Sequence, residues 1–85
     1  MNHNKLPANI GSKLKRLREM KRYSQQYVAD AVSISRRTLI NIEANASDTS
    51  MGTLISLANV FGLSITDLIE KSEVELVRKV LEQTD

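Results

Sequence analysis

Residues 24–45, SQQYVADAVSISRRTLINIEAN, have the pattern of two short helices separated by a tight turn. Ser24 and Ser35 stand at the expected helix starts, where a serine hydroxyl can accept an unpaired backbone N–H of the first turn. The apolar positions follow helical spacing and are Val28, Ala29 and Val32 in the first segment, and Leu39 and Ile42 in the second. The small Ala29 indicates that the two helices cross closely. This pattern constrains the fold to one built around a tightly packed helix pair.

The outward face of the second helix, over residues 36–44, has the chemistry of a base-reading surface. B-DNA has a major groove about 12 Å wide, which admits one α-helix, and arginine and asparagine fit the edges of guanine and adenine. Arg36 and Arg37 oppose the helix macrodipole at a cost of about 0.3–1 kcal/mol each, which indicates a polyanionic ligand. An exposed Ile40 suits contact with a thymine methyl group. We therefore expect Arg36, Arg37, Ile40 and Asn41 to contact DNA bases.

The remainder of the chain also shows helical periodicity, without a strand signal. Ile10, Leu14 and Leu17 form an apolar stripe in the first helix. Ser50, Ser64 and Ser72 are the expected N-caps of three later helices, and Ser72 with Glu75 has capping-box spacing. The apolar positions of these helices are Met51, Leu54, Leu57, Ala58 and Phe61, then Ile65, Leu68 and Ile69, and finally Val74, Val77 and Leu81. We predict an all-α fold with five bundled helices and a short amphipathic C-terminal helix.

The charges of the chain are unevenly divided. The net charge of the 85 residues is +2. Residues 1–45 hold nine basic and three acidic side chains, which gives +6, whereas residues 46–85 hold three basic and seven acidic ones, which gives −4. A basic half favours a polyanion such as DNA. Charge asymmetry also arises by chance in small domains, so it supports the DNA interpretation without establishing it.

Composition argues against several other classes. The chain has no cysteine, and its one histidine, His3, lies in a polar N-terminal segment, so we expect no metal and no cofactor. No combination of residues suggests a catalytic triad or a phosphate-binding loop, so we expect no enzyme. No apolar run approaches a membrane span and no signal peptide opens the chain, so the expected location is the cytoplasm. Residues 1–9 are expected to form a flexible arm, residues 10–70 the DNA-binding domain and residues 71–85 a C-terminal helix that could serve as a dimerisation element.

Four segments in order resemble the Xre/Cro, or lambda-repressor-like, helix-turn-helix family. They are IGSKLKRLRE at 10–19, SQQYVADAV at 24–32, SRRTLINIE at 35–43 and MGTLISLANVFGLSITDLI at 51–69. The resemblance implies that the helix over residues 36–44 enters the major groove and that Gln25 contacts the DNA backbone and supports this helix. It also implies an ion pair between Arg18 and Glu43, and a homodimer on half-sites ~34 Å apart.

The sequence departs from the family pattern just before and just after the helix expected over residues 36–44. Ser33 and Asn45 occupy positions where glycine is common, and the segment ANASDTS has no basic residue for a phosphate contact. Backbone contacts are therefore expected from the basic residues of the first helix and from the N-terminal arm. Some residues are expected to contact the DNA backbone or to support the helix over residues 36–44. They are Ser24, Gln25, Gln26, Ser35, Thr38, Lys13, Arg16 and Lys21.

The apolar row Val74, Val77 and Leu81 is wide for a short terminal helix, since Leu76 and Val80 lie beside it. It must cover the core of the domain or meet a second copy, and it is the first candidate for a dimer interface. Two alternatives remain at this point. The chain could be an antitoxin, with a toxin as partner, or a restriction–modification controller of the same fold. It could also be a protein-interaction adaptor, although paired arginines are unusual on an adaptor face.

Overall fold

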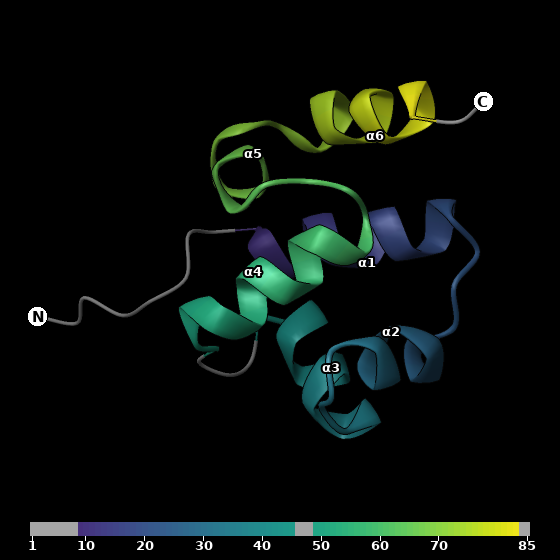
Figure 1. Ribbon diagram of the computed structural model, residues 1–85, viewed down its shortest axis with the longest axis vertical. Helices are drawn as coiled ribbons and strands as arrows, with labels where there is room; N and C mark the ends of the chain where they lie inside the picture. Colours follow the sequence, from purple (N-terminus) through teal and green to yellow (C-terminus); the bar gives the residue numbers. More distant parts are fainter. Residues whose placement is uncertain (1–8, 46–48, 84–85) are drawn as a thin grey trace, which may run out of the picture.

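Six helices make up the part of the chain that the structure, a computed structural model, describes, namely residues 9–45 and 49–83 (Figure 1). They are α1 (Ile10–Met20), α2 (Gln25–Ala31), α3 (Arg36–Glu43), α4 (Met51–Val60), α5 (Ile65–Glu70) and α6 (Glu73–Glu82). No strand occurs within these ranges. The expected all-α class is confirmed, as is the order of five bundled helices followed by a C-terminal amphipathic one. Residues 1–8, most of the expected N-terminal arm, lie outside the described residues.

Serine side chains begin every helix except α1. The hydroxyl groups accept backbone N–H groups three residues ahead, and the caps are Ser24, Ser35, Ser50, Ser64 and Ser72. At α6 the carboxylate of Glu75 also accepts the backbone N–H of Ser72 at 2.9 Å, which completes a capping box and lowers the pKa of Glu75. These local hydrogen bonds explain why the helix starts are predictable from sequence.

Left-handed residues end several of the helices. Arg22, Ser33, Asn45 and Gly62 all have φ between 57° and 70° and follow α1, α2, α3 and α4. For a residue with a Cβ this conformation costs about 1–2 kcal/mol, and asparagine tolerates it better than most. Ser33 and Asn45 therefore adopt the left-handed backbone that glycine commonly supplies.

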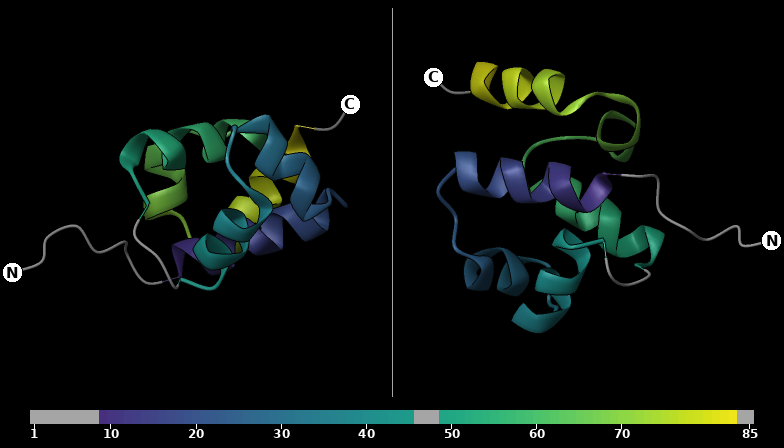
Figure 2. Two further views of the ribbon diagram at one scale, coloured as in Figure 1. Left: turned by 90° about the horizontal axis from the view of Figure 1, so that it is seen from below. Right: turned by 180° about the vertical axis from the view of Figure 1, so that it is seen from behind.

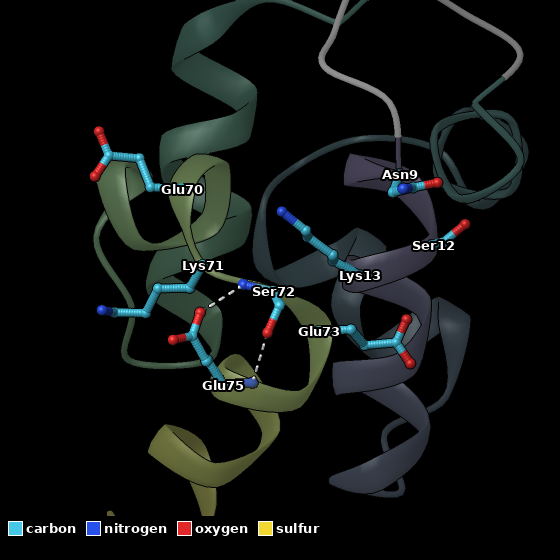
Figure 3. Close-up of a pocket in the computed structure, with 8 residues that line it drawn as sticks. All are labelled: Asn9, Ser12, Lys13, Glu70, Lys71, Ser72, Glu73 and Glu75. Carbon is cyan, nitrogen blue, oxygen red and sulfur yellow. Dashed lines mark hydrogen bonds between the residues drawn. The ribbon is translucent and has the colours of Figure 1, made fainter.

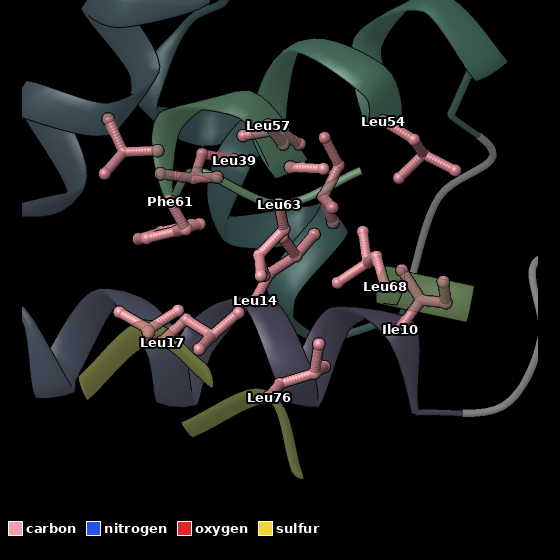
Figure 4. Packing of buried hydrophobic residues seen from close by; sticks show 14 of the residues in the cluster. Ile10, Leu14, Leu17, Leu39, Leu54, Leu57, Phe61, Leu63, Leu68 and Leu76 are labelled. Atoms are coloured by element: carbon pink, nitrogen blue, oxygen red, sulfur yellow. The ribbon is translucent and has the colours of Figure 1, made fainter. Parts of the chain in front are cut away.

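The first helix runs through the middle of the molecule, with α5 and α6 on one side and α2 and α3 on the other (Figures 1 and 2). The core around it is made of aliphatic side chains and one phenylalanine (Figure 4). It comprises Ile10, Leu14, Leu17, Val28, Ala29, Leu39, Ile42, Leu54, Leu57, Ala58, Phe61, Leu63, Leu68, Leu76 and Val80. Each of the six helices contributes side chains to this core, so a shift of one helix would disturb the packing of the others.

The C-terminal helix packs on the rest of the bundle instead of standing apart. Leu76 and Val80 of α6 are buried in the common core beside α1, whereas Val74 and Leu81 are 68% and 58% exposed. Val77 is partly buried at the edge of the core.

One expectation for α4 is wrong: Met51 lies at its first turn but is exposed, because the stripe that enters the core starts at Leu54.

Candidate nucleic-acid interface

The exposed face of α3 lies at the end of the molecule farthest from α6 (Figure 1). Leu39, Ile42 and Glu43 turn inward and are buried. Arg36, Arg37 and Thr38 are exposed, Ile40 is 39% exposed and Asn41 is partly exposed. The spacing that predicted an inner and an outer face is therefore confirmed, and four of the outer side chains are those expected to contact bases.

Hydroxyl groups hold the first turn of α3. Ser35 Oγ accepts the backbone N–H of Thr38 at 3.0 Å and donates to Thr38 Oγ1 at 2.8 Å. Among residues 9–45 and 49–83, no acidic side chain forms an ion pair with Arg36 or Arg37. Their guanidinium groups are therefore available to a ligand at the positive end of α3, where an anion is favoured.

A buried ion pair anchors the far end of α3 to α1. Arg18 Nε lies 2.7 Å from Glu43 Oε2, and Arg18 also donates to Glu43 Oε1 at 3.1 Å and to the carbonyl of Tyr23 at 3.1 Å. The side chains are only 11% and 4% exposed, respectively, and the hydrogen bond to Glu43 raises the pKa of Arg18. This is the ion pair that the resemblance implies, and it fixes α3 against α1.

The expected supporting residues of α2 contact protein groups in different ways. Gln25 Nε2 donates to Glu43 Oε1 at 3.4 Å, so this side chain links the start of α2 to the end of α3. Gln26 Nε2 instead donates to Asp30 within its own helix at 2.9 Å, and Ser24 caps α2. Gln25 thus has the geometry to support α3, whereas the contacts of Gln26 and Ser24 are local.

Two basic residues of α1 that are expected to contact the DNA backbone have partners within the protein. Lys13 Nζ donates to the carbonyls of Leu68 and Ile69 at 3.1 and 3.4 Å, at the end of α5. Arg16 Nε lies 3.6 Å from Glu73 Oε2 at the start of α6. Both side chains thus lie on the side of α1 that faces α5 and α6, away from α3, and Figure 3 shows Lys13 there. An amphipathic pattern marks them as polar without showing which neighbouring helix they face.

Lys21 is the third basic residue expected to contact the backbone. It is exposed just beyond α1, with Nζ 5.9 Å from the ring centre of Tyr23. The segment ANASDTS, with no basic side chain, spans residues 44–50, and its residues 46–48 lie outside the described part of the chain. Of the three basic side chains, Lys21 is the one without a hydrogen bond or ion pair to another group among the described residues, and a phosphate contact stays a prediction for all three.

Sequence reasoning missed a contact between the start of α1 and the end of α3. The backbone N–H of Gly11 donates to Asn45 Oδ1 at 2.9 Å, across 34 positions of sequence. A Cβ on Gly11 would lie 2.1 Å from the carbonyl oxygen of Ile42. The one local signal was a glycine in the first turn of a predicted helix, where it is unfavourable without a packing reason.

Residues 9–45 and 49–83 contain neither a cluster suited to a metal ion nor a helix suited to a membrane. No group of three or more His, Cys, Asp or Glu side chains there could hold a metal ion. No helix in the same ranges is long and apolar enough to cross a membrane. A cleft where α1, α5 and α6 meet is lined by both lysine and glutamate side chains (Figure 3) and shows no dominant charge.

The arrangement of two helices joined at Ser33, with the second one exposed, matches a known family model. The model, described as helix-turn-helix, covers residues 14–68, which is more than half of the chain. The chain belongs to the Xre/Cro-like helix-turn-helix family of DNA-binding regulators. In this arrangement α2 and α3 take the places of the first and second helices of a helix-turn-helix motif, the second of which generally enters the major groove in proteins of this kind.

Two Bacillus subtilis (strain 168) proteins are similar in sequence to this helix-turn-helix chain. The HTH-type transcriptional regulator ImmR is 32% identical over 66 residues, which is 78% of this chain and 52% of ImmR. The SPbeta prophage-derived uncharacterized HTH-type transcriptional regulator YonR is 38% identical over 62 residues, or 73% of this chain and 56% of YonR. The chain thus spans little more than half the length of these relatives.

Two solved structures share the helix-turn-helix fold. The clp gene regulator ClgR from Corynebacterium glutamicum superposes with a TM-score of 0.68 at 23% identity, over 87% of this chain and 74% of ClgR. A complex of the SinR protein with the SinI protein gives a TM-score of 0.67 at 25% identity, over 87% of this chain and 79% of the matched chain. Both likenesses support the assigned fold.

Proposed function

We propose that this chain is a cytoplasmic, sequence-specific double-stranded DNA-binding transcriptional regulator that reads the major groove with α3. The observation that carries the proposal is the outer face of α3, where Arg36, Arg37, Ile40 and Asn41 are all accessible to a ligand. Both arginines lack an acidic partner among the described residues, so DNA binding would not require breaking an ion pair there. Similarity to two transcriptional regulators supports the same function.

Residue chemistry separates the side chains that would select bases from those that would position the protein on DNA. Arginine can donate two hydrogen bonds to one guanine, asparagine can pair with adenine, and an aliphatic side chain can contact a thymine methyl group. Arg36, Arg37, Asn41 and Ile40 would therefore select the sequence. Ser35, Thr38 and Gln25 would hold α3 or the start of α2 near phosphates, which position the protein without selecting bases.

Arg37→Ala is expected to weaken binding to a duplex selected by the wild-type chain from a random-sequence pool by about 1–3 kcal/mol. Binding to an unselected duplex should fall much less, because it depends on total charge more than on base contacts. Fluorescence anisotropy titrations at several salt concentrations measure both effects. An equal loss on the two duplexes would contradict a base-reading role for Arg37.

Arg16→Ala is the matched control, since it also removes a largely exposed guanidinium. Because Arg16 contacts Glu73 on the side of α1 away from α3, its loss should change binding to either duplex by no more than about 0.5 kcal/mol. A loss as large as that of Arg37→Ala would show that total positive charge, and not the α3 surface, governs binding.

We further propose that the chain acts as a homodimer on a palindromic operator and that Val74, Val77 and Leu81 contribute to the dimer interface. Val74 and Leu81 expose most of their apolar surface on one ten-residue helix, with Val77 between them. Such a row suits contact with the same row of a second copy, since a two-fold interface is self-complementary. Deleting α6 would not test this cleanly, because Leu76 and Val80 belong to the core.

Val74→Asp is expected to raise the dimer dissociation constant at least about tenfold, because a carboxylate in an apolar contact loses hydration. The fold should be unaffected, since the side chain is mostly exposed. Ile55→Asp, at an exposed aliphatic position of α4, is the control. Sedimentation equilibrium measures the dimer dissociation constant of both variants. A dimer weakened by Ile55→Asp and not by Val74→Asp would move the interface from α6 to α4.

A partner protein is the alternative that one observation favours, because a structural neighbour of this chain is a complex of two different proteins. An antitoxin or a restriction–modification controller would still bind duplex DNA through α3. A pure adaptor would not, and titration with unselected duplex at low salt separates these cases. Salt-dependent binding is expected here, and its absence would favour the adaptor.

A further inference from the structure

The start of α1 differs from the start of every other helix in the described residues. Asn9 occupies the N-cap position, but its φ is 74° and its side chain makes no cap hydrogen bond (Figure 3). As in α2, α3 and α4, the first turn of α1 has no acidic residue. The unpaired N–H groups at a helix start normally bond to the side chain of the N-cap residue, so α1 lacks the usual local cap.

The missing acceptor comes from the end of α3. Asn45 Oδ1 accepts the backbone N–H of Gly11, the second residue of α1, at 2.9 Å. That N–H is one of those which an N-cap side chain ordinarily satisfies. Asn45 also ends α3: its φ is 57° and its backbone N–H donates to the carbonyl of Ile42 at 3.0 Å. One residue therefore terminates α3 and caps α1.

The contact is close because Gly11 has no side chain. A Cβ there would lie 2.1 Å from the carbonyl oxygen of Ile42 and 2.9 Å from that of Glu43. The positive end of α1 therefore meets the negative end of α3, an arrangement that the two helix dipoles favour. Figure 2 shows the two helix ends side by side. We call the contacts among Gly11, Asn45 and Ile42 the α1–α3 joint.

We propose that Asn45 is a positioning residue for DNA recognition, which caps α1 from α3 and so fixes how α3 presents its base-reading face. The inference rests on the proposed function of α3. The ion pair of Arg18 with Glu43 and the α1–α3 joint hold the last turn of α3 at two points on α1. Together with the burial of Leu39 and Ile42 in the core, these two attachments restrict rotation of α3 about its contact with α1, and the loss of one would weaken that restriction. Base hydrogen bonds are directional, so selectivity depends on that restriction.

Asn45→Gly tests the proposal because glycine keeps the left-handed backbone at lower cost but removes the acceptor. If Asn45 only fills a turn, this variant should bind DNA as well as the wild type. If it positions α3, the ratio of affinities for selected and unselected duplex should fall about fivefold, the factor that a typical helix cap is worth. The selected duplex is the one obtained from a random-sequence pool with the wild-type chain.

Amide hydrogen exchange followed by NMR provides the second readout. In Asn45→Gly the Gly11 amide should exchange about fivefold faster, while the amide of Lys13, which donates to the carbonyl of Asn9, serves as an internal reference. Asn45→Asp retains an acceptor oxygen and should keep slow exchange at Gly11. Its added charge should weaken binding to both duplexes alike, so the affinity ratio should stay near that of the wild type.

The outcomes separate the two proposals. A wild-type chain that prefers no duplex sequence would overturn the proposed function, and with it the positioning role. A wild-type preference that Asn45→Gly retains in full, despite faster Gly11 exchange, would overturn the positioning role alone. Unchanged Gly11 exchange in Asn45→Gly would overturn the cap itself.

Discussion

Arg18→Ala is expected to lower the free energy of unfolding by about 3–5 kcal/mol, the usual cost of leaving one member of a buried ion pair uncompensated. Glu43 is 4% exposed and would lose both of its hydrogen bonds to the guanidinium. The carbonyl of Tyr23 would also lose a donor. Because small domains are stable by about 5–15 kcal/mol, the loss would be a large part of the total. Urea unfolding followed by circular dichroism measures it.

Two further variants test the physical reason for this cost. Arg18→Lys keeps the charge but cannot reproduce the planar, bidentate contact with Glu43, so it should recover only part of the lost stability. The double variant Arg18→Met with Glu43→Leu removes both charges from the core and should recover most of it. If Arg18→Ala costs less than about 1 kcal/mol, the pair behaves as an exposed one, and its role in holding α3 would have to be abandoned.

Gly11→Ala is expected to destabilise the protein by about 1–3 kcal/mol, although alanine is the better helix former by roughly 1 kcal/mol. The added methyl group would collide with the carbonyl oxygen of Ile42, a backbone atom that cannot move by a change of rotamer. Moving α1 away to relieve the collision would lengthen the hydrogen bond from Gly11 to Asn45. Thermal and urea unfolding should both show the loss.

Gly52→Ala is the matched control for this prediction. Gly52 lies in the first turn of α4, where an added Cβ would meet only Ser50 Oγ, at 3.9 Å. Alanine there should raise stability by up to about 1 kcal/mol, through helix propensity and a less flexible unfolded chain. The two substitutions are therefore expected to have opposite signs. A stabilising Gly11→Ala would show that α1 and α3 do not approach as closely as the structure indicates.

The candidate interface was predictable wherever it depends on one helix alone. Arg37 and Leu39 are two positions apart, which places them on different sides of an α-helix, and a serine before the helix predicted its start. The pairing of Arg18 with Glu43 came from family resemblance, since no local pattern links residues 25 positions apart. Lys13 and Arg16 show the limit of such reasoning: they are polar positions of α1 as expected, but they contact α5 and α6.

The order of the helices, and the inner and outer face of each, follow from interactions between residues that are close in sequence. These are the serine caps and the apolar residues that repeat along one face. Such signals span at most a few turns and do not indicate which helices meet. The cap that Asn45 supplies to Gly11, the partners of Lys13 and Arg16, and the exposure of Val74 all depend on how segments far apart in the chain pack together. That packing results from burying one shared core of close-packed side chains, so these contacts emerge only when the helices are assembled.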